Sequence, residues 1–199
     1  MTPPEKYSLV DIATLSEAGR LTAAHLVMEA LPPYYEVDGI EEAEMANAVA
    51  AILGDPGSEI GKGFAALCGD QVAGILNFIK AESLPGARLV GAQKLLKQLS
   101  GESVKVFREH LRNYNADFGD VPGGSLYLSR IAIGKGYRGT GLAGQMMERY
   151  LTLNNDSEEK QTCFSLHVDR NNERAIAFYR KFGFTSEDSE TRYLTMTRN

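Results

Sequence analysis

The 199-residue sequence lacks the marks of several large classes of protein. It has two cysteines, Cys68 and Cys163, too few for a disulfide framework, so a reducing cytoplasm is the expected location. No apolar run approaches the ~20 residues that a membrane-spanning helix needs. Because the first residues, MTPPEKYS, also show no signal-peptide pattern, we expect a cytoplasmic protein with no membrane partner.

Metal ligands and excess positive charge are scarce as well. The three histidines, His25, His110 and His167, show no ligand spacing, so we expect no metal. The net charge of −5 provides no general footprint for nucleic acid. The Gly-Lys-Ser/Thr end of a P-loop does not occur, which excludes that class of phosphate site. The remaining composition, 43% hydrophobic and 24% charged, is ordinary for a globular protein, and the length predicts one domain over residues 1–199.

The most informative stretch is LYLSRIAIGKGYRGTGLAG, at residues 126–144. Its first half, Leu126–Ile133, is apolar and β-branched, which predicts a buried strand. A short basic loop follows, and glycines then lead directly into an amphipathic helical pattern. Glycine lets a ligand approach the backbone, and a helix N-terminus offers unpaired N–H groups with partial positive charge. The stretch therefore predicts a site for a phosphate or pyrophosphate.

One interpretation of this loop is a dinucleotide site. The fingerprint G-x-G-x-x-G fits twice within residues 134–144, and Asp169 stands where an acid could bind the ribose. A dinucleotide domain needs several more βα units, however, and only 55 residues follow Gly144. The position in the chain therefore argues against a nicotinamide-dependent oxidoreductase.

A better match is the acyl-coenzyme A loop of the GNAT superfamily of N-acetyltransferases. Its R/Q-x-x-G-x-G/A form occurs as RGTGLA at Arg138–Ala143, directly after an apolar strand. The later segment HVDRNNERAIAFYRKFGF resembles the family's N-x-x-A-x-x-x-Y-x-x-x-G-F signature through Asn172, Ala175, Tyr179, Gly183 and Phe184. Both motifs stand in the family's order with a strand between them. The chain thus resembles a GNAT enzyme over about residues 126–184, and only in outline elsewhere.

Hydrophobic patterns predict the other elements. Strands are expected at residues 6–12, 63–68, 72–79, 126–133 and 162–168, with closing strands at Phe184 and 192–197. Helices are expected at about 14–31, 40–53, 142–153 and 172–183. Tyr34 and Tyr35 follow two prolines, which predicts that they lie in a loop.

The resemblance implies an α/β (α+β) fold, the GNAT acyl-CoA N-acyltransferase fold. This is a mixed, mostly antiparallel sheet with parallel central fourth and fifth strands, flanked by helices. The family commonly joins its third and fourth strands by a short turn, but about 40 residues intervene here. We expect a helical insertion at about 84–124, with Gly101 and Glu102 between two helices. The second helix would present Phe107, Leu111, Tyr114 and Phe118 on one face.

The resemblance also implies acetyl-coenzyme A as co-substrate. In the family, the fourth and fifth strands splay apart near a bulge, and backbone freed there pairs with the pantetheine arm. The residues expected at that gap are Ile131, Ala132 and Ile133. Those expected to hold the pyrophosphate are Gly139, Thr140, Gly141, Leu142, Ala143 and Gly144. Arg138 would position the loop or contact a phosphate, unless it is a plain surface arginine. Asn172 would contact the pantetheine arm, cap its helix, or do both.

Acyl transfer from a thioester to an amine requires two proton movements. By resemblance Tyr179 is the general acid for the departing thiolate, although a tyrosine at this helical position can also be core packing. His167 is the candidate base, since an ordinary histidine is competent near neutral pH, but lone histidines are more often structural. Tyr127 and Ser129 stand where other members hold a base or a water relay. Because no carboxylate occurs there, deprotonation through water is an alternative.

The acceptor is predicted only by class. We expect a primary amine of a small molecule or a protein, attacking directly in a ternary complex; the alternative is a GNAT-fold module that binds acyl-CoA without turnover. Tyr35 is a candidate substrate contact. Residues 36–59 hold seven acidic and no basic side chains. This stretch is either an acidic rim for a cationic amine or a solvated helix face. The insertion would cover the acceptor side or form a homodimer contact.

Overall fold

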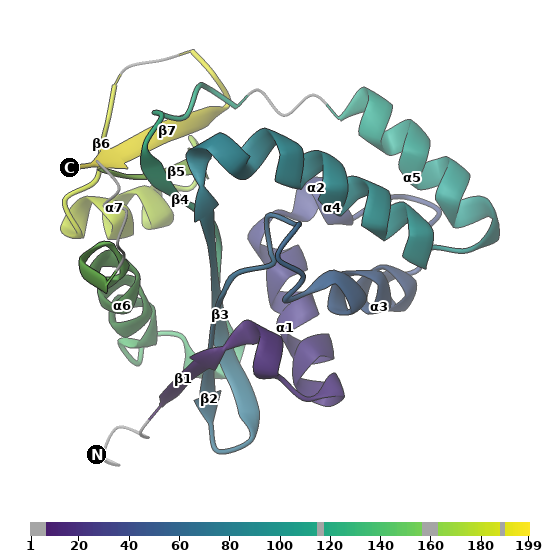
Figure 1. The fold of residues 1–199 in the computed structure, drawn as a ribbon, viewed down its shortest axis with the longest axis horizontal. Helices are drawn as coiled ribbons and strands as arrows, with labels where there is room; N and C mark the ends of the chain where they lie inside the picture. Colours follow the sequence, from purple (N-terminus) through teal and green to yellow (C-terminus); the bar gives the residue numbers. More distant parts are fainter. Residues whose placement is uncertain (1–6, 115–117, 157–162, 188–189) are drawn as a thin grey trace.

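The computed structural model describes residues 7–114, 118–156, 163–187 and 190–199. Its centre is a seven-stranded sheet in the order β1-β2-β3-β4-β5-β7-β6 (Figure 1). Neighbouring strands pair antiparallel except β4 and β5, which are parallel as predicted. The strands are β1 (Ser8–Asp11), β2 (Gly63–Cys68), β3 (Gln71–Lys80), β4 (Ser125–Ile133), β5 (Cys163–Asp169), β6 (Thr185–Ser186) and β7 (Tyr193–Arg198).

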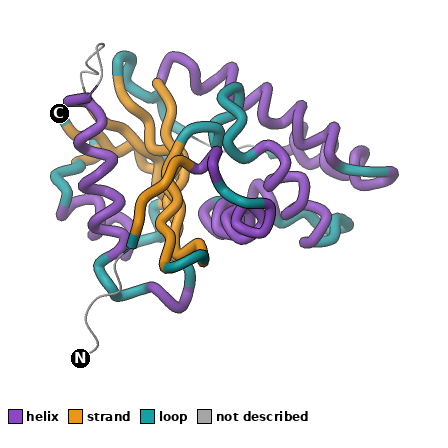
Figure 2. The backbone as a smooth tube through the Cα atoms, turned by 60° about the horizontal axis from the view of Figure 1, so that its bottom comes forward, coloured by secondary structure: helices purple, strands orange, loops and turns teal. Residues whose placement is uncertain are grey.

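Helices cover both faces of this sheet. Helices α6 and α7 lie on one face, and α1 to α5 gather on the other (Figure 1); the two layers are also visible in Figure 2. The helices are α1 (Glu17–Ala30), α2 (Pro32–Tyr35), α3 (Glu42–Ile52), α4 (Leu84–Gln98), α5 (Gly101–Asn113), α6 (Leu142–Asp156) and α7 (Glu173–Lys181). None of the helices in the described residues is long and apolar enough to cross a membrane.

Each layer of helices forms its own hydrophobic core against the sheet. Ile75 and Leu76 are neighbours in β3, yet Ile75 packs into the core with α1 and α3, and Leu76 into the core with α6. This division follows from the alternation of side chains along a strand. Because both faces of the central strands are buried, β3 and β4 are nearly continuous apolar runs, which is why the sequence identifies them clearly.

The prediction that Tyr34 and Tyr35 lie in a loop is wrong. They belong to the short helix α2, which begins at Pro32. Proline ends a helix that precedes it, but it suits the first turn of a new helix, where its missing N–H needs no partner. The turn buries Tyr35 and packs the Tyr34 ring edge-on against Phe107. A contact with the insertion thus supports this turn.

The insertion contains two helices as predicted, α4 and α5, but their boundaries differ from the prediction. Helix α5 begins at Gly101, whose φ of +49° turns the chain into it, so Gly101 and Glu102 do not form the linker. Phe118 fits the helical spacing but lies beyond the end of α5 at Asn113. Its backbone bridges to Tyr193 of β7, and its ring packs 4.5 Å from the Tyr193 ring. Tertiary pairing therefore overrides the local pattern.

The predicted bulge and splay of the central strands are confirmed. Asn77 of β3 pairs with Arg130 and Phe78 with Leu128, so Ser129 is an extra residue in β4. The parallel pairing of β4 with β5 runs from Ser125 to Leu128, and within the described residues β4 does not pair with β5 beyond Leu128. The second half of β4 therefore has one backbone edge without a strand partner.

Helix α6 is anchored to β4 by a buried hydroxyl. Tyr150 is fully buried and donates a 2.7 Å hydrogen bond to the carbonyl oxygen of Leu126. Its ring packs edge-on against Phe164 of β5. One side chain thus connects α6 to both parallel strands, and so helps to direct the start of α6 toward the open end of β4.

We predict that Tyr150→Phe lowers the free energy of unfolding by about 1–3 kcal/mol, because the buried carbonyl of Leu126 loses its side-chain donor. Urea denaturation of wild type and variant measures this. Tyr137→Phe is the matched control, since the Tyr137 hydroxyl donates to Gln71 at an exposed site, and it should shift stability by less than about 0.5 kcal/mol. Equal effects of the two substitutions would contradict the anchoring role of Tyr150.

Candidate active site

A cavity of about 1200 Å³ lies along the open edge of β4. Its walls come from the end of α1, the second half of β4, the glycine loop, the start of α6, the end of β5 and one face of α7. Phe118 lines it as well, so the insertion contributes to the wall. The cavity is large enough for a coenzyme together with a small acceptor.

The glycine loop leaves its backbone accessible at one end of the cavity. Gly139 and Gly141 have φ values of +82° and +88°, and an added Cβ on either would meet nothing within 4 Å. Helix α6 starts directly afterwards, at Leu142, and the amide of Gln145 already bonds back to the carbonyl of Gly141. The N–H groups of the first turn therefore have no partner within the helix. These features fit the diphosphate of a coenzyme.

Arg138 and Thr140 hold the loop in place. The Arg138 Nε donates to the carbonyl of Ile133 at 2.9 Å, and its Nη2 pairs with Glu29 of α1 at 2.8 Å. The Thr140 hydroxyl donates to the carbonyl of Tyr137 at 2.7 Å. Of the roles predicted for Arg138, the structure thus displays the positioning of the loop.

The predicted pantetheine contacts lie along the same cavity. Ile131, Ala132 and Ile133 line it and pair on their other edge with β3. Asn172 lies across from them at the start of α7, where its side-chain oxygen accepts from the amide of Ala175 at 3.0 Å. Asn172 is therefore a helix cap on the cavity wall, which leaves its amide nitrogen available for a ligand.

Tyr179 lines the cavity from α7 and is 7% exposed. Burial raises its pKa above the ordinary value of about 10, and the nearby hydroxyl of Tyr127 raises it further. Tyr179 therefore keeps its proton at neutral pH and has a hydrogen to donate into the cavity.

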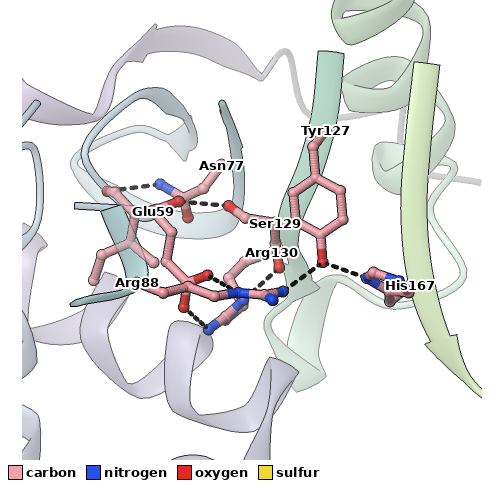
Figure 3. Close-up of polar contacts among 8 residues, drawn as sticks. Glu59, Asn77, Arg88, Tyr127, Ser129, Arg130 and His167 are labelled. Carbon is pink, nitrogen blue, oxygen red and sulfur yellow. Dashed lines mark hydrogen bonds and ion pairs between the residues drawn. The ribbon is translucent and has the colours of Figure 1, made fainter. Parts of the chain in front are cut away.

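His167 and Tyr127 form a hydrogen-bonded pair across the gap between β5 and β4 (Figure 3). The Nε2 of His167 lies 3.0 Å from the carbonyl oxygen of Gly119, so this nitrogen carries the hydrogen. Its Nδ1 then accepts from the Tyr127 hydroxyl at 3.0 Å. Arg88 donates to the same hydroxyl at 3.4 Å. The imidazole is therefore fixed as one neutral tautomer.

The surroundings of His167 disfavour its protonated form. Burial, followed by the positive charge of Arg88, lowers its pKa from 6.5 to about 4, against a small opposing effect of the bond to Gly119. Burial raises the pKa of Tyr127 to about 12. Both groups of the pair are thus neutral near pH 7, and a proton taken up there is not retained.

The other two predicted substrate contacts occupy different places. Ser129, the bulge residue, lines the cavity, and its hydroxyl donates to the carbonyl of Glu59 at 2.6 Å. Tyr35 does not line the described cavity and is 3% exposed. The guanidinium carbon of Arg130 lies 5.8 Å from the centroid of the Tyr35 ring. The structure therefore brings Ser129 to the site directly and Tyr35 only through Arg130.

The sequence analysis missed a buried ion cluster beside this site. Glu59 pairs through one oxygen with Arg130 at 2.8 Å and through the other with Arg88 of α4 at 3.3 Å (Figure 3). The sequence did offer one signal for this cluster, because Arg130 is a charged residue within the apolar run of β4. It offered none for Glu59 and Arg88, because Glu59 lies 71 residues from Arg130 and 29 residues from Arg88 along the chain.

The acidic stretch 36–59 does not act as one surface. Glu44 accepts hydrogen bonds from Ser100 and Ser103 of the insertion, and Asp55 pairs with Lys94. Glu59 is buried in the ion cluster. The described part of the chain contains no group of three candidate metal ligands, and the expected absence of a metal stays a prediction.

Comparisons with known proteins agree with this architecture. The model of the acetyltransferase (GNAT) family matches residues 26–184. The chain is similar to an N-acetyltransferase from Staphylococcus aureus Mu50, with a TM-score of 0.71 and 19% sequence identity. The alignment covers 95% of this chain and 100% of that protein. No curated protein sequence matches.

Two further solved structures have the same fold. PaiA N-acetyltransferase from Thermoplasma acidophilum, in complex with coenzyme A, covers 98% of this chain and 99% of its own, with a TM-score of 0.53 and 11% identity. Naa50 from Arabidopsis thaliana, in complex with the bisubstrate analogue CoA-Ac-MVNAL, covers 97% and 98%, with a TM-score of 0.50 and 18% identity. At these identities the likeness is one of fold.

We predict that His167 makes the protein less stable in mild acid. Because its pKa is about 4 when folded and about 6.5 when unfolded, the unfolded chain binds the extra proton between these values. The free energy of unfolding therefore falls from pH 7 to pH 5, by at most about 2 kcal/mol for this group. Urea denaturation at both pH values should show a smaller fall in the free energy of unfolding for His167→Gln than for wild type. The other titrating groups are the same in both proteins, so their contributions cancel in this comparison. Equal falls in wild type and variant would indicate that His167 has an ordinary pKa in the folded protein.

Proposed function

The chain belongs to the acetyltransferase (GNAT) family, and from this premise we propose that it moves an acetyl group from acetyl-coenzyme A to a primary amine. The acceptor is a small molecule or a protein, and its amine attacks directly in a ternary complex. One observation carries the proposal. A single cavity joins the open backbone of the glycine loop to Tyr179, Tyr127 and His167, at the point where β4 and β5 separate.

The donor would lie along β4. The N–H groups at the start of α6, which have no partner within the helix, would bind the diphosphate, and the backbone of Ile131–Ile133 would pair with the pantetheine arm along the edge that β5 leaves open. Arg174 and Lys181 also line the cavity and add positive charge. The complexes of the PaiA and Naa50 enzymes with coenzyme A and a coenzyme A conjugate support this assignment. When bound, the donor supplies an activated thioester.

Tyr179 is the proposed acid. As the amine nitrogen bonds to the thioester carbonyl carbon, the C–S bond breaks and the sulfur takes up a proton. A buried, protonated hydroxyl beside the reacting groups can donate it, and the raised pKa keeps Tyr179 in that form at neutral pH. The proton is replaced from solvent after release of the thiol.

Tyr127 and His167 are the proposed route for the proton that the amine loses. The Tyr127 oxygen accepts it and passes its own proton to Nδ1 of His167, along the 3.0 Å hydrogen bond already present. The bond from Nε2 to the carbonyl of Gly119 stays in place throughout. Since the pKa of His167 is about 4, the imidazolium releases its proton to solvent and the pair is reset.

We predict that Ala143→Glu weakens coenzyme A binding by more than about tenfold, because a carboxylate beside the diphosphate repels it by several kcal/mol at ~4 Å in a partly buried site. Ala143 lies in the first turn of α6, where a glutamate otherwise stabilises a helix, so the fold should persist. Isothermal titration calorimetry with coenzyme A measures the effect.

Ala143→Gln is the matched control for this experiment. It has nearly the same size as glutamate but no charge, so any loss that it shows reports crowding alone. Loss of affinity confined to the glutamate variant supports an anion site at this turn. An unchanged dissociation constant for Ala143→Glu would place the coenzyme elsewhere.

We predict that Tyr179→Phe lowers kcat by about 10²–10⁴-fold, the range for a positioned acid, with little change in coenzyme A affinity. The measurement is thiol release from acetyl-CoA over a panel of primary amines. Wild-type protein that binds coenzyme A but releases no thiol with any amine would indicate an acyl-CoA-binding module instead. Wild-type turnover in the variant would make Tyr179 a packing residue.

A further inference from the structure

Positive charge exceeds negative charge at the acceptor end of the cavity. Arg88 and Arg130 share one carboxylate, that of Glu59, and within the described residues no other acid pairs with either arginine. Burial alone would raise the pKa of Glu59, but Arg130 and then Arg88 outweigh it, so the pKa is lowered and the carboxylate stays charged. Two cations and one anion leave a net charge of about +1 beside Tyr127.

Part of this charge is buried and incompletely bonded. The Arg130 side chain is 4% exposed and lines the cavity. Its Nη1 donates to the carbonyl of Ser129 at 2.7 Å and its Nη2 to Glu59, but its buried Nε has no hydrogen-bond partner among the described residues. Positive charge in such a low-dielectric place attracts an anion much more strongly than it would in water.

Arg88 has donors left for a ligand. Its Nε bonds Glu59, its Nη2 lies 3.4 Å from the Tyr127 oxygen, and the described contacts include none for Nη1. The guanidinium lies over the Phe118 ring at 4.6 Å from the centroid, which fixes its plane. The side chain remains 34% exposed. Arg88 does not itself line the described cavity, but its guanidinium contacts Tyr127 and Phe118, which do. It is therefore oriented, partly exposed and only partly neutralised, which suits recognition of a carboxylate beside Tyr127.

The described carboxylates of the cavity wall are already paired elsewhere. Glu29 pairs with Arg138 at 2.8 Å, and Asp169 pairs with Arg192 at 3.3 Å. Neither is free to receive an additional positive charge on the acceptor. The predicted acidic rim for a cationic amine therefore has no counterpart at this end of the described cavity.

We propose that the acceptor is an amine that carries an anionic group two or three bonds from its nitrogen, as an α-amino acid does, and that Arg88 binds this group with the support of Arg130. The proposal rests on the proposed function, which brings the amine to Tyr127. Because Arg88 lies next to Tyr127, the anion and the amine must be close together in the ligand. Polyamines and the N-termini of long peptides do not meet this condition.

The test uses thiol release from acetyl-CoA with matched acceptors. Glycine is compared with glycinamide, phenylalanine with phenethylamine, and O-phosphoethanolamine with ethanolamine. We expect kcat/KM to favour at least one acid over its neutral partner by about tenfold or more. The carboxylate and phosphate pairs show which anion the site takes, and either preference supports the proposal.

Variants of Arg88 assign this preference to the side chain. Arg88→Gln should abolish it by raising KM for the acid relative to its neutral partner, and Arg88→Lys should restore it in part. Because Arg88 also donates to Tyr127 and lowers the pKa of His167, kcat changes for both partners alike, so the readout is the ratio of the two kcat/KM values. Comparison of the acid-to-neutral ratio between wild type and variant removes the effect of the amines' different basicities, because that effect is the same in both proteins. Arg108→Gln, on the exposed surface of α5, is the matched control and should behave as wild type.

A binding measurement separates this inference from the proposed function. Calorimetry with the same acids in the presence of coenzyme A detects the site even without turnover. Binding of the acids that Arg88→Gln abolishes, without thiol release, would support the anion site while refuting the enzyme. A kcat/KM that is equal for acids and neutral amines, or that falls equally for both in Arg88→Gln, would overturn the anion site and leave the enzyme intact.

Discussion

One extra residue in β4 determines the architecture of the site. Ser129 interrupts the ladder with β3, and the parallel ladder with β5 ends one residue earlier, at Leu128. A strand that bends away from its neighbour leaves backbone groups without partners, and a soluble protein tolerates this only where water or a ligand can satisfy them. The cavity opens along this stretch of backbone. The irregularity of the sheet and the location of the site are thus one feature.

The ion cluster behind the bulge explains why this irregular strand keeps its shape. Ser129 donates its hydroxyl hydrogen to the carbonyl of Glu59 and accepts from Arg130 through its own carbonyl, so both partners of the buried pair hold the bulge residue. A buried ion pair is weak evidence for stability, because desolvation offsets much of its attraction. Buried ion pairs are better attested as groups that select one conformation. Here the ion cluster holds the bulge of β4 in place and supplies positive charge at the proposed acceptor end of the cavity.

The sequence predicted the local structure of the proposed coenzyme side far better than that of the proposed acceptor side. The glycine loop, the start of α6 and the cap at Asn172 are local features, since each depends on residues within a few positions of one another, and local chemistry is legible in sequence. The cluster of Glu59, Arg88 and Arg130 depends on contacts between distant segments, which no local pattern encodes. The helical spacing that included Phe118 misled for the same reason: its partner is Tyr193, 75 residues away in the chain.

The same contrast suggests how this fold could keep the proposed coenzyme site while the acceptor changes. The donor-side backbone is offered by β4 and α6, whose positions are fixed by the sheet and by the buried Tyr150. The acceptor side is finished by the insertion: Arg88 reaches Tyr127 from α4, and Gly119 fixes the tautomer of His167 from the segment after α5. Replacement of these helices would alter both the charge beside the amine and the pKa of the proposed base, with the coenzyme site intact. In the proposed reaction, acceptor choice and proton transfer are therefore coupled through one segment.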